Sequence, residues 1–345
     1  MLNKLRAVLF LILLTLCALA GCSTYVANSS QTEVETPLAT ESLENDVLLI
    51  TQPGLAYQRV TGTLQIAFLD VGQGDCIYVS LPNGKSMLID AGESSKAEDI
   101  IKYISENSVS GMIDYVVATH PHADHIGGMA DIINAFEIGN IWMPDAVHTT
   151  KTFENLLDTI EANHLSIQIA EAGQTLFDYG NLKAVFAAPS GRDYANLNNH
   201  SAVVLLTYND RQFLFMGDAE RESETEILST GFDISADVLK VGHHGSTTSS
   251  TQDFIAAVAP SYAVITCGLG NRYGHPNAQT LAALAEDNIT VVRTDEDGTI
   301  VFVCDDDGNI TFTTFTTEVQ PRAPNTAPQE TAAPISTQEM PTEGG

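Results

Sequence analysis

The sequence predicts an α/β fold in which two packed β-sheets carry helices on their outer faces. Strand-like runs come first in the globular part, and strands then alternate with amphipathic helices in two successive halves. In both halves, histidine or aspartate residues follow directly after apolar strands. Since layered α/β folds bind ligands beyond the carboxyl ends of strands, we expect the two halves to share one site along a common edge.

The first half is predicted from its apolar runs and from the turn signals between them. Residues 64–69 alternate like a strand, and the segment 82–85 (Pro-Asn-Gly-Lys) is a hairpin signal. Strands are expected over residues 64–69, 76–81, 86–92, 115–118 and 139–143. Helices are expected over residues 96–107, about 126–136 and 151–164.

The second half continues with a hairpin and further strand–helix alternation. Strands 201–208 and 211–216 would pair across Asn209-Asp210, and turns are expected at residues 297–298 and 307–308. Further strands are expected over residues 236–241 and 262–267, with three short ones within 290–315. Helices are expected over residues 221–229, 251–258 and 277–287.

Composition limits the classes of partner. The 345 residues suffice for one large domain or two small ones, and they include 15 basic and 44 acidic residues. Such acidity disfavours non-specific binding of nucleic acid or anionic membrane by the surface alone. A solvated surface explains most of this acidity. Bound divalent cations would offset some of the negative charge at a metal site. Buried free thiols are expected at Cys76, Cys267 and Cys304, since each lies in an apolar run.

Residues 1–21 are interpreted as a lipoprotein signal peptide. A short basic region is followed by the apolar run 7–18, which is too short for a comfortable membrane span. Residues 19–22 (Leu-Ala-Gly-Cys) resemble a bacterial lipobox, which implies cleavage before Cys22 and lipidation of that residue. The protein would then be lipid-anchored to the cell membrane on its extracytoplasmic side. The alternatives are an uncleaved signal anchor or an ordinary signal peptide.

Two polar segments flank the expected globular domain, which is placed at residues 61–317. Residues 22–60 are rich in Ser, Thr, Asn, Glu and Gln and are interpreted as a flexible tether. Residues 318–345 are rich in Pro, Thr and Glu and are interpreted as a disordered tail.

Four metal-capable side chains follow the apolar strand 115–118 within six residues, namely His120, His122, Asp124 and His125. His120 and His122 project together only from extended chain, whereas the adjacent Asp124 and His125 must point apart. One ion cannot easily take all four, but two neighbouring ions can. Imidazole with carboxylate suits zinc, manganese or iron. The alternative is a polar turn without metal.

Further candidates follow strands later in the chain. Asp218 can bridge two cations, or it can cap a helix N-terminus. Of the adjacent His243 and His244, one is expected as a ligand and the other as a proton donor or substrate contact, unless both lie in a solvated loop. His275 is a candidate or a packing residue, and His200 is a candidate third ligand of a first metal. His148 and His164 are interpreted as surface residues.

The metal-type residues resemble the motifs of the metallo-β-lactamase superfamily in their spacing and order. More narrowly, several segments resemble the metallo-β-lactamase-like domain of the ComEC family of competence DNA-uptake proteins, namely residues 68–75, 199–201, 217–218, 241–246 and 273–276. The resemblance covers about residues 63–316. It implies an α/β metallo-β-lactamase αβ/βα four-layer sandwich with two divalent metal ions, zinc or manganese.

The resemblance also implies roles for individual residues. His120 and His122 would bind the first metal, with Asp218 as the bridge. The second metal would be bound by Asp124, His125 and His244. His243 would contact a phosphate oxygen of the substrate, and Asp90 would support the metal-binding loop from behind. The Gly-His-x-Pro-Gly setting of many members is absent, so His200 is the expected substitute, with Asn198 and Asn199 as neighbours.

These expectations predict a metal-dependent hydrolase, in which a hydroxide activated by two metals attacks a phosphodiester. His243 or His275 would protonate the leaving group. The competence resemblance favours single-stranded DNA, whereas the acidic surface mildly disfavours a long polyanion. Alternatives are a small ester or phosphorylcholine on a wall polymer, and least of all a β-lactam. A lipid-anchored binding protein with a vestigial metal fold is the alternative from another class.

Overall fold

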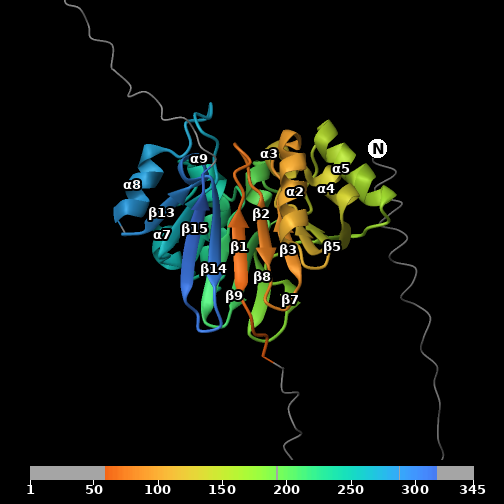
Figure 1. Cartoon of the computed structure of the whole chain (residues 1–345). Helices are drawn as coiled ribbons and strands as arrows, with labels where there is room; N and C mark the ends of the chain where they lie inside the picture. The colour runs from red at the N-terminus through yellow and green to blue at the C-terminus, as the bar shows by residue number, and fades with distance from the viewer. Residues whose placement is uncertain (1–58, 192, 287, 317–345) are drawn as a thin grey trace, which may run out of the picture. The chain divides into compact units, whose positions relative to one another are not determined.

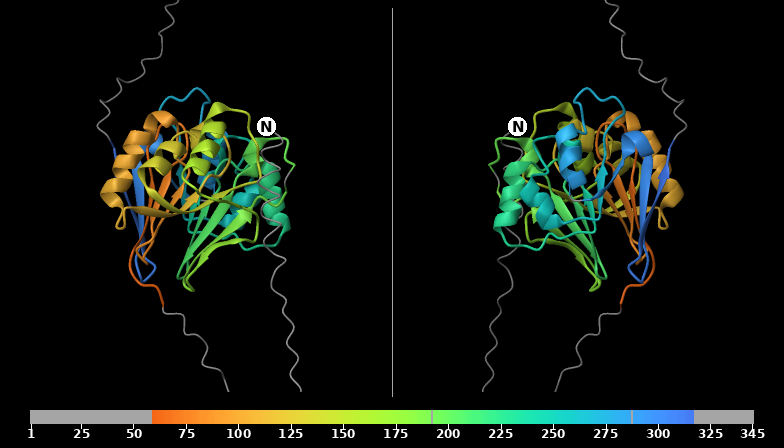
Figure 2. Two further views of the ribbon diagram at one scale, coloured as in Figure 1. Left: turned by 90° about the vertical axis from the view of Figure 1, so that its right-hand side faces the viewer. Right: turned by 90° about the vertical axis from the view of Figure 1, so that its left-hand side faces the viewer.

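Two mixed β-sheets form the centre of the fold (Figures 1 and 2). The first consists, in spatial order, of β15 (Ile310–Phe315), β14 (Thr299–Cys304), β1 (Leu64–Phe68), β2 (Ile77–Ser80), β3 (Ser86–Ile89), β4 (Met112–Val117), β5 (Glu137–Met143) and β6 (Ile167–Ile169). The second consists of β13 (Thr290–Arg293), β12 (Tyr262–Ile265), β11 (Val238–Lys240), β10 (Arg211–Phe215), β9 (Val203–Tyr208), β8 (Leu182–Ala188) and β7 (Thr175–Asp178).

This computed structural model describes residues 59–316, except 192 and 287. The expected signal peptide 1–21, Cys22, nearly all of the tether 22–60 and the tail 318–345 lie outside the described residues. In the described part, no helix is sufficiently long and apolar to cross a membrane.

An apolar core between the sheets holds them together. Alternate residues of β1 (Leu64, Ile66 and Phe68) point into this core, while Ala67 faces the opposite side of the sheet. Phe68 reaches Phe215 of the other sheet, with their ring centres 6.1 Å apart. Burial of these apolar side chains from both sheets is the main favourable term for their association.

Helices cover the outer face of each sheet. The first sheet carries α2 (Ala97–Asn107), α4 (Met129–Ala135) and α5 (Lys151–Ala162), whose buried faces form a second apolar cluster with it. The second sheet carries α6 (Arg221–Ser229), α7 (Gln252–Val258) and α8 (Ala278–Glu286), which form a third. The order helix, sheet, sheet, helix confirms the predicted αβ/βα four-layer sandwich, and Figure 2 shows the helices outside both sheets.

The helix predicted over about 126–136 is present as α4 but begins three residues later. A separate short helix, α3 (Ala123–Ile126), precedes it, with Gly127 and Gly128 between the two. A Cβ on Gly127 would stand 2.5 Å from the Ala123 carbonyl oxygen, and one on Gly128 would stand 2.6 Å from that of Ala91. The two glycines therefore permit this segment to pass against the loop that follows β3.

Candidate metal centre

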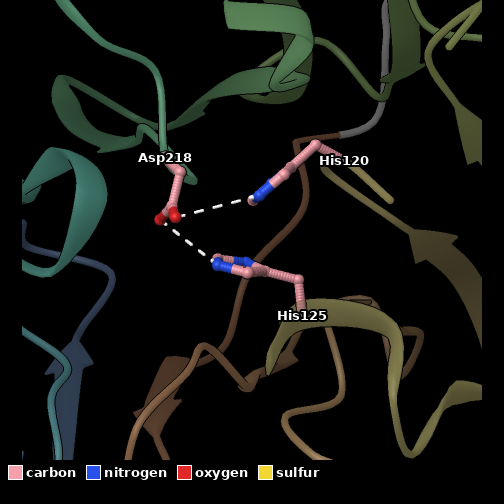
Figure 3. A group of neighbouring side chains, drawn as sticks. All are labelled: His120, His125 and Asp218. Carbon is pink, nitrogen blue, oxygen red and sulfur yellow. Dashed lines mark ion pairs between the residues drawn. The ribbon is translucent and has the colours of Figure 1, made fainter. Parts of the chain in front are cut away.

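Loops from both sheets meet at one end of the sandwich. His120 and His122 follow β4, while Asp124 and His125 lie in the short helix α3. Asp218 follows β10 of the second sheet. Figure 3 shows His120 and His125 pointing toward Asp218, which reaches them from the opposite loop.

The two carboxylate oxygens of Asp218 face different groups of imidazoles. Its Oδ1 lies 3.2 Å from His125 Nε2 and 3.4 Å from His244 Nε2. Its Oδ2 lies 3.8 Å from both His120 Nε2 and His243 Nε2. A carboxylate placed between two groups of nitrogens has the geometry of a bridge between two cations.

The group around Asp218 Oδ1 has the donor set of a metal site. Asp124, His125 and His244 bring ligand atoms within 4.8 Å of one another, and Asp124 Oδ2 lies 3.5 Å from His244 Nε2. Two ligands of one tetrahedral ion, each at about 2.1 Å, lie about 3.4 Å apart. The observed separations therefore leave room for an ion between these atoms.

Three of these buried atoms make no hydrogen bond within the described part of the chain, namely His125 Nε2, His244 Nε2 and Asp218 Oδ1. Buried polar atoms are rarely left without a partner, because desolvation then costs about 1–3 kcal/mol each. Here they converge on one point, and imidazole with carboxylate is a set that zinc and manganese accept. The residues therefore fit a divalent cation.

The second group lies around the other oxygen of Asp218. His120, His125 and Asp218 form a further group of metal-capable residues. His120 Nε2 and His122 Nδ1 face each other at 2.9 Å, so the two histidines of the His-x-His pair converge as their spacing predicts. His120 is buried and His122 is half-buried at the edge of the cavity.

The pKa values of these side chains are shifted by one another in a way that fits a bound cation. Burial alone would lower the pKa of His125, but Asp218 and Asp90 hold that pKa well above its usual value. Burial would raise the pKa of Asp218, but His125 and His244 hold it well below. Burial lowers the pKa of His120, with a further contribution from His125. Without a cation these groups compete for protons, whereas a divalent ion binds carboxylates and neutral imidazoles.

Asp90 lies behind the centre, where the resemblance placed a support for the metal-binding loop. This buried carboxylate accepts hydrogen bonds from Thr119 N (2.8 Å) and Thr119 Oγ1 (2.6 Å), and it lies 2.7 Å from His125 Nδ1. A carboxylate at Nδ1 holds the proton there and leaves Nε2 free for a metal. Strand β3 ends at Ile89 rather than at residue 92 because Asp90 takes a positive φ of 59°.

Asp90→Asn is expected to weaken metal binding about 10- to 100-fold, because His125 loses the carboxylate that fixes its proton and orientation. Competition with a chromophoric chelator would measure the affinity. Asp99→Asn on the exposed face of α2 is the matched control and should leave the affinity unchanged. An Asp90→Asn protein that folds and binds metal as tightly as the wild type would contradict this role.

The adjacent His243 and His244 lie in a turn rather than in extended chain. Both have positive φ values, 45° and 53°, which non-glycine residues rarely adopt. The turn aims His244 Nε2 at Asp218 Oδ1 and His243 Nε2 at Asp218 Oδ2. His244 Nδ1 is held by the Thr266 carbonyl oxygen at 2.9 Å.

Sequence reasoning missed Glu220, which holds His243 in place. Glu220 Oε1 lies 2.9 Å from His243 Nδ1 and accepts hydrogen bonds from Asn198 Nδ2 (2.9 Å) and Thr248 Oγ1 (2.9 Å). Its place two residues after Asp218 is the signal that could have found it.

His200 is not brought to the centre. It lies in the 3₁₀ turn Leu197–His200, where residues two apart point to different sides. Asn198 of this turn lines the cavity, whereas the His200 ring packs edge-on against Tyr194 with ring centres 4.9 Å apart. The buried Asn198 Oδ1 makes no hydrogen bond in the part that the structure describes. Asn198 therefore replaces His200 as the candidate for the remaining position on the first metal.

Two other histidines lie beside the centre. The His275 ring is 5.4 Å from that of His243, and its buried Nδ1 has no hydrogen-bond partner in residues 59–316 as described. Burial, with His243 and His244, lowers the pKa of His275 to about 4, so its imidazole is neutral at pH 7. His148, interpreted as a surface residue, in fact packs against His122 with ring centres 5.8 Å apart.

A buried ion pair under the centre was also missed. Lys240 Nζ lies 2.8 Å from Asp75 Oδ2, and both side chains are almost fully buried. Asp75 Oδ1 accepts a hydrogen bond from Thr266 Oγ1 and lies 3.3 Å from His244 Nδ1. The available signal is a single lysine in the otherwise apolar run 238–241.

The centre opens into a cavity of about 320 Å³. Atoms of both sheets' loops line it, and the lining residues include His122, Asp124, Asn198, Asp218, His243, His244, Tyr273 and His275. A substrate in this cavity would therefore reach the metal-capable residues, His243 and His275 at once.

Comparison with known proteins agrees with this geometry. The family described as Metallo-beta-lactamase superfamily matches residues 69–268, more than half of the chain. "ComE operon protein 3" of Bacillus subtilis (strain 168) is 29% identical over 260 residues, which cover 70% of this chain and 33% of that protein. "Recombination protein 2" of Haemophilus influenzae is 28% identical over 241 residues, covering 68% of this chain and 28% of that protein.

"Competence protein ComA" of Neisseria gonorrhoeae is 28% identical over 232 residues, which cover 66% of this chain and 30% of that protein. This chain spans no more than about a third of the length of these curated relatives. The likeness therefore concerns one part of each relative.

Proposed function

The chain belongs to the metallo-β-lactamase superfamily, and from this premise we propose that it is a metal-dependent phosphodiesterase or nuclease. The observation that supports the proposal most is the position of Asp218, whose two oxygens face two groups of imidazoles beside an open cavity. Metallo-β-lactamase-fold proteins are in general metal-dependent hydrolases, and two of the relatives are a recombination protein and a competence protein by name.

Two divalent cations would be held on either side of Asp218. His120 and His122, with Asn198 as candidate, would hold the first. The second would be held by Asp124, His125 and His244. Such a pair of cations supplies an activated water near neutral pH and neutralises charge on a phosphoryl group.

His243 has the placement of a substrate-contacting proton donor. Glu220 at Nδ1 keeps a proton on that nitrogen and directs Nε2 toward Asp218 and the cavity. Protonated Nε2 can donate to a non-bridging phosphate oxygen or to the leaving oxygen, a role worth about 10²–10⁴-fold in rate. The neutral His275 beside it can accept a hydrogen bond at its free Nδ1.

The setting of the enzyme is part of the proposal. Lipidation of Cys22 after removal of residues 1–21 would anchor the protein on the extracytoplasmic membrane face. Residues 22–60 would act as tether, 61–317 as catalytic domain and 318–345 as tail. The resemblance to competence DNA-uptake proteins favours single-stranded DNA as substrate, and one relative is a competence protein by name. The net charge of −29 favours a short phosphodiester over a long polyanion, because like charges repel.

The purified protein is expected to contain about two equivalents of divalent metal and to cleave bis-(4-nitrophenyl) phosphate. Elemental analysis and release of 4-nitrophenolate measure the two properties. Removal of metal with a chelator should abolish cleavage, and manganese or zinc should restore it. His122→Ala should fold but be inactive. Absence of both metal and cleavage, even with added manganese or zinc, would favour a binding protein with a vestigial site.

A further inference from the structure

The loop between β12 and α8 presents an exposed aromatic ring at the mouth of the cavity. Tyr273 lines the cavity, yet 53% of its surface is exposed, and Leu269 on the same loop is 61% exposed. Arg272 places its guanidinium carbon 4.9 Å from the Tyr273 ring centre and donates to Tyr273 Oη at 2.7 Å. Exposed aromatic rings beside a reactive centre commonly contact ligands.

The side chain of Asn271 and a backbone hydrogen bond hold this loop in place. Asn271 Nδ2 donates to the carbonyl oxygens of Gly268 (2.9 Å) and His275. Asn271 Oδ1 accepts from the backbone N–H of Tyr273 and of His275, each at 3.1 Å. Asn277 N donates to Gly245 O at 2.9 Å and ties the loop to the His243-His244 turn. A rigid loop presents its ring with little loss of conformational entropy on binding.

The rings form a path from the metal centre to the loop. His275 lies 5.4 Å from His243 between ring centres, and Tyr273 lies stacked on His275 at 5.8 Å with an interplanar angle of 23°. A substrate whose phosphate meets His243 would therefore place its neighbouring group against Tyr273.

Arg272 lacks the carboxylate partner that several other basic residues of the described chain have. Each of Lys85, Lys183, Lys240 and Arg293 pairs with a carboxylate. Arg272 makes no ion pair with a carboxylate among the described residues, and its guanidinium contacts Tyr273 instead. A guanidinium that makes no ion pair with a carboxylate can take an incoming phosphate.

We propose that Tyr273 and Arg272 form the nucleoside-recognition element of this site. The nucleobase next to the cleaved phosphodiester stacks on the Tyr273 ring, and Arg272 moves from that ring to a neighbouring phosphate. The proposal rests on the phosphodiesterase function above and narrows its substrate to a single-stranded nucleotide. Base–aromatic stacking is sequence-tolerant and contributes about 1–3 kcal/mol per base.

Phosphorylcholine, the competing phosphodiester head group, fits this element poorly. A quaternary ammonium binds to the face of aromatic rings, typically within a cage of several rings. Here Arg272, the neighbour of Tyr273 in the chain, keeps a positive charge beside the ring and would repel a second cation. The same guanidinium attracts a nucleotide phosphate, so the charge distinguishes the two substrates.

Two substrates with one leaving group test the proposal, namely thymidine 5′-(4-nitrophenyl phosphate) and methyl 4-nitrophenyl phosphate. The wild-type protein with manganese should prefer the thymidine ester in kcat/KM. Tyr273→Ala should reduce the ratio of the two kcat/KM values about 5- to 100-fold, and Tyr273→Phe should retain it. Phe315→Ala, at an exposed aromatic on β15, is the matched control and should change neither value.

A second measurement needs no turnover. A tetrathymidylate carrying one 2-aminopurine should lose fluorescence on binding the wild-type protein in EDTA, because the base stacks, and Tyr273→Ala should not quench it. Failure of the wild type to cleave either ester would overturn the phosphodiesterase proposal itself. Cleavage of both esters without preference, or an unchanged ratio in Tyr273→Ala, would overturn only the role of Tyr273. An equal loss of kcat/KM on both esters would indicate that Tyr273 only supports His275. That result would also overturn the stacking role of Tyr273.

Discussion

Asp218→Ala is expected to lose at least about 10³-fold in kcat/KM and to retain at most about one equivalent of metal per chain. Among the residues that the structure describes, Asp218 is the one carboxylate that faces both groups of imidazoles, at 3.2 Å from His125 Nε2 and 3.8 Å from His120 Nε2. Without it, two cations near each other would repel, and one charged ligand of each would be missing. Loss of one metal removes several kcal/mol of transition-state stabilisation, and each 1.36 kcal/mol is tenfold in rate.

Elemental analysis of the folded variant, with circular dichroism as the check on folding, separates this prediction from simple unfolding. Asp218→Asn keeps one oxygen acceptor and should retain more metal than Asp218→Ala. Asp253→Ala, at an exposed position on α7, is the matched control and should behave as the wild type. Two tightly held ions with the wild-type rate in Asp218→Ala would show that the carboxylate does not bridge.

Much of the fold could be predicted because its elements are encoded locally. The hairpin of β9 and β10 pairs Tyr208 with Arg211 across Asn209-Asp210, where the sequence placed the turn. The helix α6 also has the predicted bounds. The short helix α3 was not predicted as a separate element because the cause of its end is tertiary, namely the close approach of Gly127 to Ser94 and of Gly128 to Ala91.

The candidate site could be predicted only in part. His120, His122, Asp124 and His125 share one loop, so their spacing alone indicates that they act together. Asn198 lines the cavity and His200 does not, because only one side of their 3₁₀ turn faces the centre. The spacing of residues in the sequence does not show which side of the turn that is. Asp75 and Lys240 are far apart in sequence, and only the packing of the two sheets joins them.

Lys240→Met is expected to lower the free energy of unfolding by about 3–5 kcal/mol. Lys240 Nζ lies 2.8 Å from Asp75 Oδ2, and the two side chains are 0% and 1% exposed. Removal of the ammonium leaves the Asp75 carboxylate buried without its counter-charge, which costs more than the pair itself contributes. Burial would raise the pKa of Asp75, but Lys240 and His244 hold it well below its usual value, so this carboxyl is charged at pH 7.

Urea unfolding would measure the change, and a melting temperature lower by roughly 6–20 °C should accompany it for a domain of this size. Lys183→Met is the control, because its pair with Asp178 is exposed and should contribute no more than about 1 kcal/mol. The double variant Asp75→Asn with Lys240→Met should recover much of the loss, since no buried charge remains. If the double variant were no more stable than Lys240→Met, the loss would come from packing of the lysine stem rather than from the uncompensated carboxylate. Because Asp75 also lies 3.3 Å from His244 Nδ1, Lys240→Met should weaken metal binding as well, whereas Lys183→Met should not.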